Sequence, residues 1–206
     1  SIQRRHQKIF EESPSPALTK KERLEIGILS ANATKKLGYL GLGTMEFLYE
    51  NKQFYFIEMN TRLQVEHPIT EIITGLDLVC EQIKIASGIE MTIKQQNIKF
   101  NGHAIECRIN AENSESFIPS PGKIETYHPS GGPGVRVDSS VYQGYVVQPF
   151  YDSLIAKLII FADNRQVCIA RTKRALEEFI IEPIDTSLNL HRKLINDPDL
   201  KIGNYS

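Results

Sequence analysis

The stretch Phe56-Ile57-Glu58-Met59-Asn60-Thr61-Arg62-Leu63-Gln64-Val65-Glu66-His67-Pro68 is the most informative part of this chain. It begins as an aromatic strand and continues with polar residues at every second position, namely Glu58, Asn60, Arg62, Gln64 and Glu66. Side chains of an extended chain alternate between its two faces, so this spacing predicts that all five project to one side. Two carboxylates, two amides and a guanidinium in one row are unusual for a solvated edge and indicate a functional site.

The residue types in this row suit a small set of reactions. Carboxylate and amide oxygens are hard ligands of the kind that Mg²⁺ takes from proteins, usually together with substrate phosphates. The guanidinium of Arg62 can grip a small oxyanion through two parallel hydrogen bonds. Glu66, further along the row, can serve as a general base. Metal ligands, an anion clamp and a base on one segment predict phosphoryl or carboxyl transfer.

A second carboxylate is expected to join Glu58 from the preceding strand. Residues 43–50 and 53–60 have the pattern of a hairpin, with Asn51-Lys52 between the strands. Opposed residues of an antiparallel hairpin have a constant index sum, so Glu46 and Glu58 share a face only if that sum is even. A two-residue turn gives an odd sum, whereas a three-residue loop closed by a bulge gives an even one. We therefore expect the two glutamates to converge across a hairpin with an odd-length loop.

These motifs resemble those of a known enzyme family. Glu58-Met59-Asn60-Thr61-Arg62 resembles the metal-binding strand of ATP-grasp enzymes, and Leu63-Gln64-Val65-Glu66-His67-Pro68 resembles its continuation in biotin carboxylases. Further matches follow in order over essentially the whole chain: Gln3-Arg4-Arg5-His6-Gln7-Lys8, 41–47, 106–112, 119–124 and Tyr151-Asp152-Ser153. The resemblance implies an α+β fold in two domains. Residues 1–95 would form the C-terminal half of an ATP-grasp domain, and residues 96–206 the biotin carboxylase C-terminal domain, an antiparallel sheet with flanking helices.

The resemblance also implies a role for individual residues. Metal ligation, to Mg²⁺ or Mn²⁺, is implied for Glu46, Glu58 and Asn60. ATP contacts are implied for Gln3, His6 and Leu48, the last against the adenine. Bicarbonate binding is implied for Lys8, Arg62, Gln64 and the backbone of Val65, with Glu66 as the base that deprotonates bicarbonate. Arg108 resembles the arginine that stabilises the enolate-like form of biotin, so catalytic roles are implied for Lys8, Arg62, Glu66 and Arg108.

The implied activity is that of an ATP-dependent ligase, which carboxylates biotin on a carrier protein through carboxyphosphate. This is the first half-reaction of a biotin-dependent carboxylase, such as the acetyl-CoA carboxylase of fatty acid biosynthesis. The implied partners are a biotin carboxyl carrier protein, a second copy in the case of the full-length protein, and carboxyltransferase subunits. A carbamoyl-phosphate-synthetase-like ATP-grasp ligase and a non-catalytic assembly fragment remain as alternatives. The chain begins in mid-strand and lacks the family's nucleotide lid, so we expect the isolated chain to be inactive.

Composition excludes several other classes. The net charge is −1, which gives no electrostatic basis for binding nucleic acid or an anionic membrane. No apolar run approaches the roughly 20 residues that span a bilayer, so a cytoplasmic or organelle-matrix location is expected. The three cysteines are widely spaced and odd in number, which argues against disulfides and zinc. Helical patterns predict burial for Cys80 and Cys168, and the histidines at 67, 103, 128 and 191 lack metal spacing and are interpreted as structural.

Local signals predict most of the secondary structure. A strand is expected over 2–11, and Thr19 with Glu22 forms a capping box for a helix that ends at Gly38. After the hairpin we expect a helix over about 76–86. In the second half we expect strands near 102–110, 123–128, 134–138 and 153–161. Helices are expected there near 164–180 and 186–196.

Overall fold

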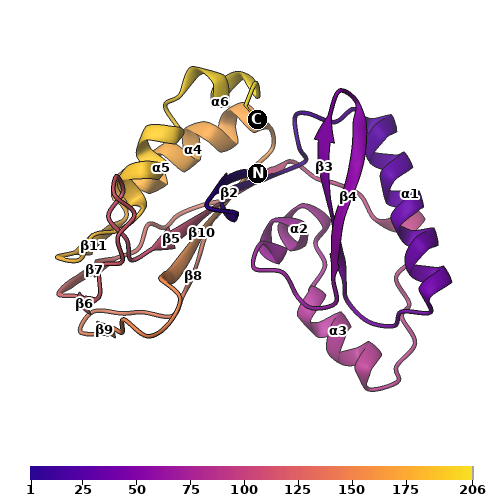
Figure 1. Cartoon of the computed structure of the whole chain (residues 1–206), viewed down its shortest axis with the longest axis horizontal. Helices are drawn as coiled ribbons and strands as arrows, with labels where there is room; N and C mark the ends of the chain where they lie inside the picture. Colours follow the sequence, from indigo (N-terminus) through magenta and orange to yellow (C-terminus); the bar gives the residue numbers. More distant parts are fainter. Residues whose placement is uncertain (206) are drawn as a thin grey trace. The chain divides into compact units, whose positions relative to one another are not determined.

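The computed structural model describes residues 1–205, which form two compact units (Figure 1). One unit combines Ser1–Pro14 with the chain from Phe100 onward, and the other is Ser15–Lys99. Helices and strands occur in both, so the α+β class is confirmed. Within residues 1–205, none of the helices is long and apolar enough to cross a membrane.

A five-stranded antiparallel sheet organises the first unit. Its strands are β1 (Ile2–Arg4), β2 (Gln7–Ser13), β5 (His103–Asn110), β10 (Leu154–Ala162) and β8 (Val135–Ser139), in that order across the sheet. One face is apolar and fully buried, with Phe10, Ile105, Cys107, Leu158 and Ile160 in the core. Helix α4 (Arg165–Glu178) contacts β5 and β10 and contributes Cys168 and Leu176 to this core. The opposite face carries Glu11 of β2 together with Glu106 and Arg108 of β5.

The segment expected to be one strand over 2–11 is instead a tight hairpin. Strands β1 and β2 are joined by Arg5 and His6, which both have positive φ, 48° and 64°. Two-residue hairpin turns require this left-handed backbone, and they usually recruit Asn or Gly for it. Arg5-His6 carries no such signal, so the expectation of a single strand was wrong.

Shorter elements complete the first unit. Two small ladders pair β6 (Gly122–Lys123) with β9 (Val146–Val147), and β7 (Thr126–His128) with β11 (Ile180–Glu182). The predicted strand over 123–128 is thus divided between two ladders. Helices α5 (Leu188–Leu194) and α6 (Pro198–Ile202) follow, and Asn164 caps α4, since its Oδ1 accepts from Val167 N at 3.0 Å. Two-residue and three-residue strands carry too little periodicity to be predicted, which is why β9 and β11 were missed.

A buried polar network ties the last residues of the described chain to the sheet. Glu12 accepts hydrogen bonds from Arg165 at 2.8 and 3.0 Å, contacts His103 Nε2 at 2.7 Å and accepts from the Tyr205 hydroxyl. Arg165 also donates to the carbonyls of Leu200 and Lys201. Burial alone would raise the pKa of Glu12, but the hydrogen bonds outweigh it and lower this pKa to about 2.

The second unit is built around helix α1 and one hairpin. Helix α1 (Lys20–Leu37) has the predicted capping box of Thr19 and Glu22 and ends at Gly38, whose φ is 64°. Strands β3 (Thr44–Glu50) and β4 (Gln53–Asn60) form the hairpin, which lies alongside α1 in Figure 1. The Tyr49 hydroxyl donates to Glu22 Oε1 at 2.8 Å and links the two.

Two further helices and a short turn follow the hairpin. Helix α2 (His67–Thr74) was not predicted, although Pro68 in its first turn is a favourable start. It buries Ile69 and Ile73. Helix α3 (Leu78–Ala86) confirms the helix expected over 76–86, and the 3₁₀ turn η1 (Gln95–Asn97) precedes the return to the first unit.

The cysteines behave as unreactive thiols where they are buried. Cys168 is fully buried, and burial raises its pKa to about 12. Burial likewise raises the pKa of Cys107. Cys80 is only partly buried, so its predicted burial was wrong.

Candidate functional site

The β3–β4 hairpin has a two-residue turn and corrects its register further along. Asn51 and Lys52 both adopt positive φ, 50° and 61°, so the predicted odd-length loop was wrong. The register shifts between Phe47, which opposes Phe56, and Glu46, which opposes Glu58. Ile57 is the extra residue of a β-bulge, and it converts an odd index sum into an even one. The bulge thus places Glu46 and Glu58 on one face, as the odd-length loop was expected to do.

The carboxylates of Glu46 and Glu58 therefore lie on one face of the hairpin. Asn60 Nδ2 donates to Glu46 Oε1 at 3.2 Å and to Glu58 Oε1 at 2.9 Å, so one amide contacts both. This confirms the geometric prediction of convergence. Leu48 lies two residues beyond Glu46 on the same face and is 61% exposed. The other face is aromatic, because Phe47 packs edge-on against Phe56 with centroids 5.8 Å apart.

This pair of carboxylates fits Mg²⁺ or a similar ion whose remaining ligands come from a substrate. Among residues 1–205, no group of three or more His, Cys, Asp or Glu side chains is placed to hold a metal. Structural zinc sites need four protein ligands and catalytic ones three, so they do not match. Mg²⁺ is usually held by one or two carboxylates plus substrate phosphates, which does match. A half-turn of the Asn60 amide would present its oxygen in place of Nδ2.

The predicted row of side chains ends where the strand ends. Glu58 and Asn60 belong to β4, but residues 61–66 form an irregular turn that leads into α2. The turn is closed by His67 N, which donates to the Gln64 carbonyl at 3.2 Å, and His67 Nδ1 contacts the same oxygen at 2.8 Å. The expectation that Arg62, Gln64 and Glu66 continue the strand face was therefore wrong, because the start of α2 bends the chain.

The side-chain amide of Gln64 in this turn is available for a ligand. Gln64 is only 8% exposed, and its Nε2 has no hydrogen-bond partner among residues 1–205. A buried amide donor without a partner costs free energy, which a bound anion would relieve. Arg62 is exposed and uses Nη1 for the Leu63 carbonyl at 3.2 Å. Glu66 is the N-cap residue of α2, but its side chain makes no capping bond.

Four predicted site residues lie in the other unit. Gln3 and Lys8 are directly opposed across the β1–β2 hairpin, and His6 is exposed in its turn. Arg108 lies on β5 with its side chain 15% exposed. Each set of residues is thus grouped within its own unit, the carboxylate hairpin and the 61–66 turn in one, and Gln3, His6, Lys8 and Arg108 in the other.

The residues that hold Arg108 were missed from the sequence. Glu11 Oε1 accepts from Arg108 Nε at 2.7 Å and lies 2.5 Å from Nη2. The Arg108 carbonyl accepts from Ser187 Oγ at 3.0 Å and contacts His191 Nε2 at 2.7 Å. Burial lowers the pKa of His191 to about 4, so this imidazole is neutral at pH 7 and Nε2 is the donor.

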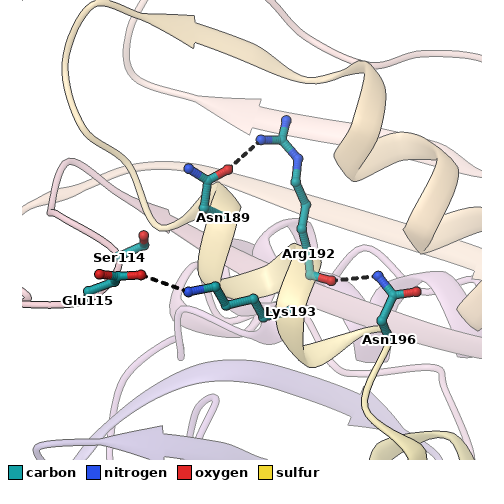
Figure 2. Close-up of a pocket in the computed structure, with 6 residues that line it drawn as sticks. All are labelled: Ser114, Glu115, Asn189, Arg192, Lys193 and Asn196. Carbon is teal, nitrogen blue, oxygen red and sulfur yellow. Dashed lines mark hydrogen bonds and ion pairs between the residues drawn. The ribbon is translucent and has the colours of Figure 1, made fainter.

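A surface pocket of about 540 Å³ in the first unit contains none of the predicted site residues (Figure 2). Its lining residues bond to one another. Lys193 Nζ donates to Glu115 Oε1 at 2.9 Å, Arg192 Nη1 to Asn189 Oδ1 at 2.7 Å, and Asn196 Nδ2 to the Arg192 carbonyl at 2.8 Å. The polar side chains of this pocket are therefore largely hydrogen-bonded to one another.

Comparison with protein families gives two matches that together span nearly the whole chain. Residues 1–94 match the ATP-binding domain of the carbamoyl-phosphate synthase L chain, and residues 106–206 match the biotin carboxylase C-terminal domain. The chain is 56% identical over 203 residues to a biotin carboxylase of Haemophilus influenzae, covering 98% of this chain and 45% of that protein. It is 54% identical over 209 residues to biotin carboxylase 1 of Bacillus subtilis, covering 100% and 46% respectively.

Solved structures give the same result. The biotin carboxylase domain dimer of Hydrogenobacter thermophilus 2-oxoglutarate carboxylase, in complex with MgADP, ADP and bicarbonate, superposes with a TM-score of 0.98 at 48% identity. That match covers 100% of this chain and 46% of the other. The chain thus spans a little under half the length of the relatives that it matches.

Proposed function

Because this chain belongs to the biotin carboxylase family, we propose that it carries the metal-binding hairpin and the bicarbonate-binding turn of an ATP-dependent ligase. The reaction proposed for the full-length protein is carboxylation of biotin on a carrier protein, with ATP and bicarbonate as co-substrates. The observation that carries the proposal is the convergence of Glu46 and Glu58 on Asn60. The match to a biotin carboxylase C-terminal domain favours this reaction over that of a carbamoyl-phosphate synthetase.

The hairpin is the proposed nucleotide and metal site. Glu46, Glu58 and Asn60 would hold Mg²⁺ or Mn²⁺, which when bound offsets the negative charge of the ATP phosphates. Leu48, exposed on the same face, is the proposed apolar contact for the adenine. Gln3 and His6 of the β1–β2 hairpin are the other proposed ATP contacts.

The turn after the hairpin is the proposed bicarbonate site, together with Lys8. Arg62, Gln64 and the backbone of Val65 would bind the anion, and the unsatisfied Nε2 of buried Gln64 supports this assignment. Glu66 would take the bicarbonate proton, so that a bicarbonate oxygen attacks the γ-phosphorus and gives carboxyphosphate and ADP. Carboxyphosphate then breaks its carbonyl carbon–oxygen bond to give CO₂ and phosphate, the phosphate takes the N1′ proton of biotin, and N1′ attacks the carbon of CO₂.

Arg108 is the proposed stabiliser of biotin during its carboxylation. As N1′ loses its proton, negative charge develops on the ureido oxygen, and a fixed guanidinium beside that oxygen lowers the barrier. Arg108 is suited to this task because its backbone and side chain are both held by neighbours.

The partners and context of the full-length protein are also proposals. The proposed partners are a biotin carboxyl carrier protein, a second copy of the protein and carboxyltransferase subunits. Similar proteins include chloroplastic biotin carboxylases and the biotin carboxylase part of a pyruvate carboxylase. Acetyl-CoA for fatty acid synthesis is one proposed acceptor, and pyruvate, which the name of the second relative supports, is another. The proposed location is the cytoplasm or an organelle. The two family matches support a domain boundary near residue 95.

Substitutions in the full-length protein test this function. Glu58→Gln removes one metal carboxylate, so the Mg²⁺ concentration for half-maximal ATP cleavage should rise about tenfold or more. Glu66→Gln removes the base, and biotin carboxylation should fall by about 10²–10⁴-fold while ATP still binds. Glu50→Gln, at the turn end of the same hairpin, should change neither quantity. Near wild-type Mg²⁺ dependence in Glu58→Gln and near wild-type rates in Glu66→Gln would refute the assignments.

A further inference from the structure

The charged face of the main sheet contains an ion pair that is more enclosed than surface pairs are. Arg108 and Glu11 side chains are 15% and 3% exposed. Their strands are neighbours, and Glu11 is directly opposed to Glu106, two residues before Arg108 on the same face of β5. Glu106 is fully buried as well. The register of β2 against β5 therefore fixes Glu11 beside Arg108.

The contact uses one edge of the guanidinium. Arg108 Nε donates to Glu11 Oε1 at 2.7 Å, and Nη2 lies 2.5 Å from the same oxygen. An arginine carries five N–H donors in a rigid planar fork, so fixing one edge also fixes the direction of the other. A charge-assisted pair of this kind limits rotation of the long side chain far more than a water contact would.

The backbone of Arg108 is fixed independently. Strand β2 pairs with β5 only as far as Cys107, so the backbone groups beyond it need other partners on that side. Ser187 and His191 supply them to the Arg108 carbonyl, and Ser187 exchanges two bonds of 2.9 Å with the backbone of Asn110. The start of α5 thus sets where the Arg108 backbone lies, and Glu11 sets where its guanidinium lies.

We propose that Glu11 is a positioning residue for biotin carboxylation, acting by orienting the Arg108 guanidinium toward the ureido oxygen of biotin. This inference rests on the function proposed above for Arg108. Stabilisation of a developing oxyanion depends on a donor that is already in place, because reorganisation during the reaction raises the barrier. Glu11 fixes the direction of the Arg108 guanidinium before the reaction and does not itself touch biotin.

The test compares two partial reactions of the full-length protein with free biotin as the probe: bicarbonate-dependent ATP cleavage and carboxybiotin formation. Glu11→Gln keeps the shape of the side chain but removes its charge. It should lower the ratio of carboxybiotin formed to ATP cleaved by about 10–100-fold, the usual scale for a charged hydrogen bond. Glu11→Asp, which keeps the charge, should recover part of the ratio. Glu115→Gln, which breaks the exposed ion pair with Lys193, is the matched control and should leave the ratio unchanged.

A double variant separates positioning from fold stability. If Glu11 acts only through Arg108, Glu11→Gln combined with Arg108→Gln should be no worse in this ratio than Arg108→Gln alone. A crystal structure of Glu11→Gln should show the guanidinium turned from its original direction. The proposal would be overturned if the double variant lowered the ratio by the product of the two single effects. It would also be overturned if Glu11→Gln slowed ATP cleavage and carboxybiotin formation by the same factor. If Glu11→Gln does not fold, Glu11→Asp replaces it in the same measurement. An unchanged ratio of carboxybiotin to ATP cleaved in Glu11→Asp, together with a crystal structure in which the guanidinium has moved, would overturn the proposal.

Failure of the underlying function looks different. If Arg108→Gln leaves the ratio of carboxybiotin to ATP unchanged, the role proposed for Arg108 is wrong. If Arg108→Gln lowers the ratio and Glu11→Gln does not, only the role of Glu11 is wrong.

Discussion

His191 shows how one buried side chain makes this fold sensitive to pH. Its ring is fully buried, and Nε2 donates to the Arg108 carbonyl at 2.7 Å. In the described residues Nδ1 has no hydrogen-bond partner, so a second proton there would be a buried charge without compensation. Burial therefore lowers the pKa of His191 to about 4, although the hydrogen bond to the carbonyl opposes this.

The consequence is a loss of stability in mild acid. The unfolded chain protonates this histidine near its ordinary pKa of about 6.5, and the folded chain only near 4. Stability is thus complete above about pH 6.5 and falls as the pH drops toward 4, by about 3 kcal/mol in all. Urea unfolding at pH 7 and pH 5 should show this slope, and His191→Gln, which keeps a donor but cannot titrate, should flatten it. The same slope in both proteins would contradict the assignment.

At the scale of elements, helix α1 depends on its N-terminal cap. Thr19 Oγ1 accepts from Glu22 N at 3.2 Å, and Glu22 Oε2 accepts from Thr19 N at 2.9 Å. The hydrogen bonds from Thr19 and Tyr49 lower the pKa of Glu22 to about 2. The helix has no fully buried residue in this chain, so its ends matter more than its packing.

Removing this cap should loosen the start of α1. Thr19→Ala should cost about 1 kcal/mol, seen as faster amide exchange in the first turn of the helix. Thr34→Ala in the same helix is the matched control. The Thr34 hydroxyl only returns to the Ser30 carbonyl at 2.8 Å, so this substitution should be neutral or slightly stabilising. An equal effect of both substitutions would show that the capping box is not what holds the first turn.

The elements also show where sequence patterns suffice. The capping box of α1, the strand near 102–110 and the helix near 164–180 were predicted because each depends on residues only two to four positions apart. The bulge at Ile57 and the Arg5-His6 turn were not, because each is set by strand pairing and uses residues without the usual glycine or asparagine. Glu11 could not be assigned to Arg108 because the two are 97 residues apart in sequence.

The second unit exposes apolar side chains on helix α1 and on the β3–β4 hairpin. Leu24, Ile28, Leu29 and Leu37 of α1 are each at least half exposed, and so are Phe56 and Ile57 of the hairpin. Exposed apolar patches of this kind favour association. The chain also spans less than half of its relatives, so part of the proposed nucleotide site would come from elsewhere in a full-length protein.

The isolated 206-residue chain should therefore be inactive. Phosphoryl transfer depends almost wholly on positioning and charge stabilisation, and both require a complete nucleotide site. Calorimetry should detect no tight MgATP binding, and no biotin-dependent ATP cleavage should be measurable. Sedimentation should show concentration-dependent association, with the full-length protein as the comparison. Turnover by the isolated chain would contradict the assignment of the site.

The path of the chain through the main sheet has a consequence for its synthesis. Strand β2 pairs with β1 along one edge, but its other edge pairs with β5, where Ser13 opposes Ala104, and all of Ser15–Lys99 lies between β2 and β5 in the sequence. A ribosome adds roughly 5–20 residues each second, so the nascent β2 edge waits several seconds or longer before β5 emerges. During this time the unpaired backbone groups of β2 can form hydrogen bonds with strands of other chains, which leads to aggregation. Slowing translation between these strands would lengthen this exposure, whereas chaperones that shield the emerging hairpin would shorten it.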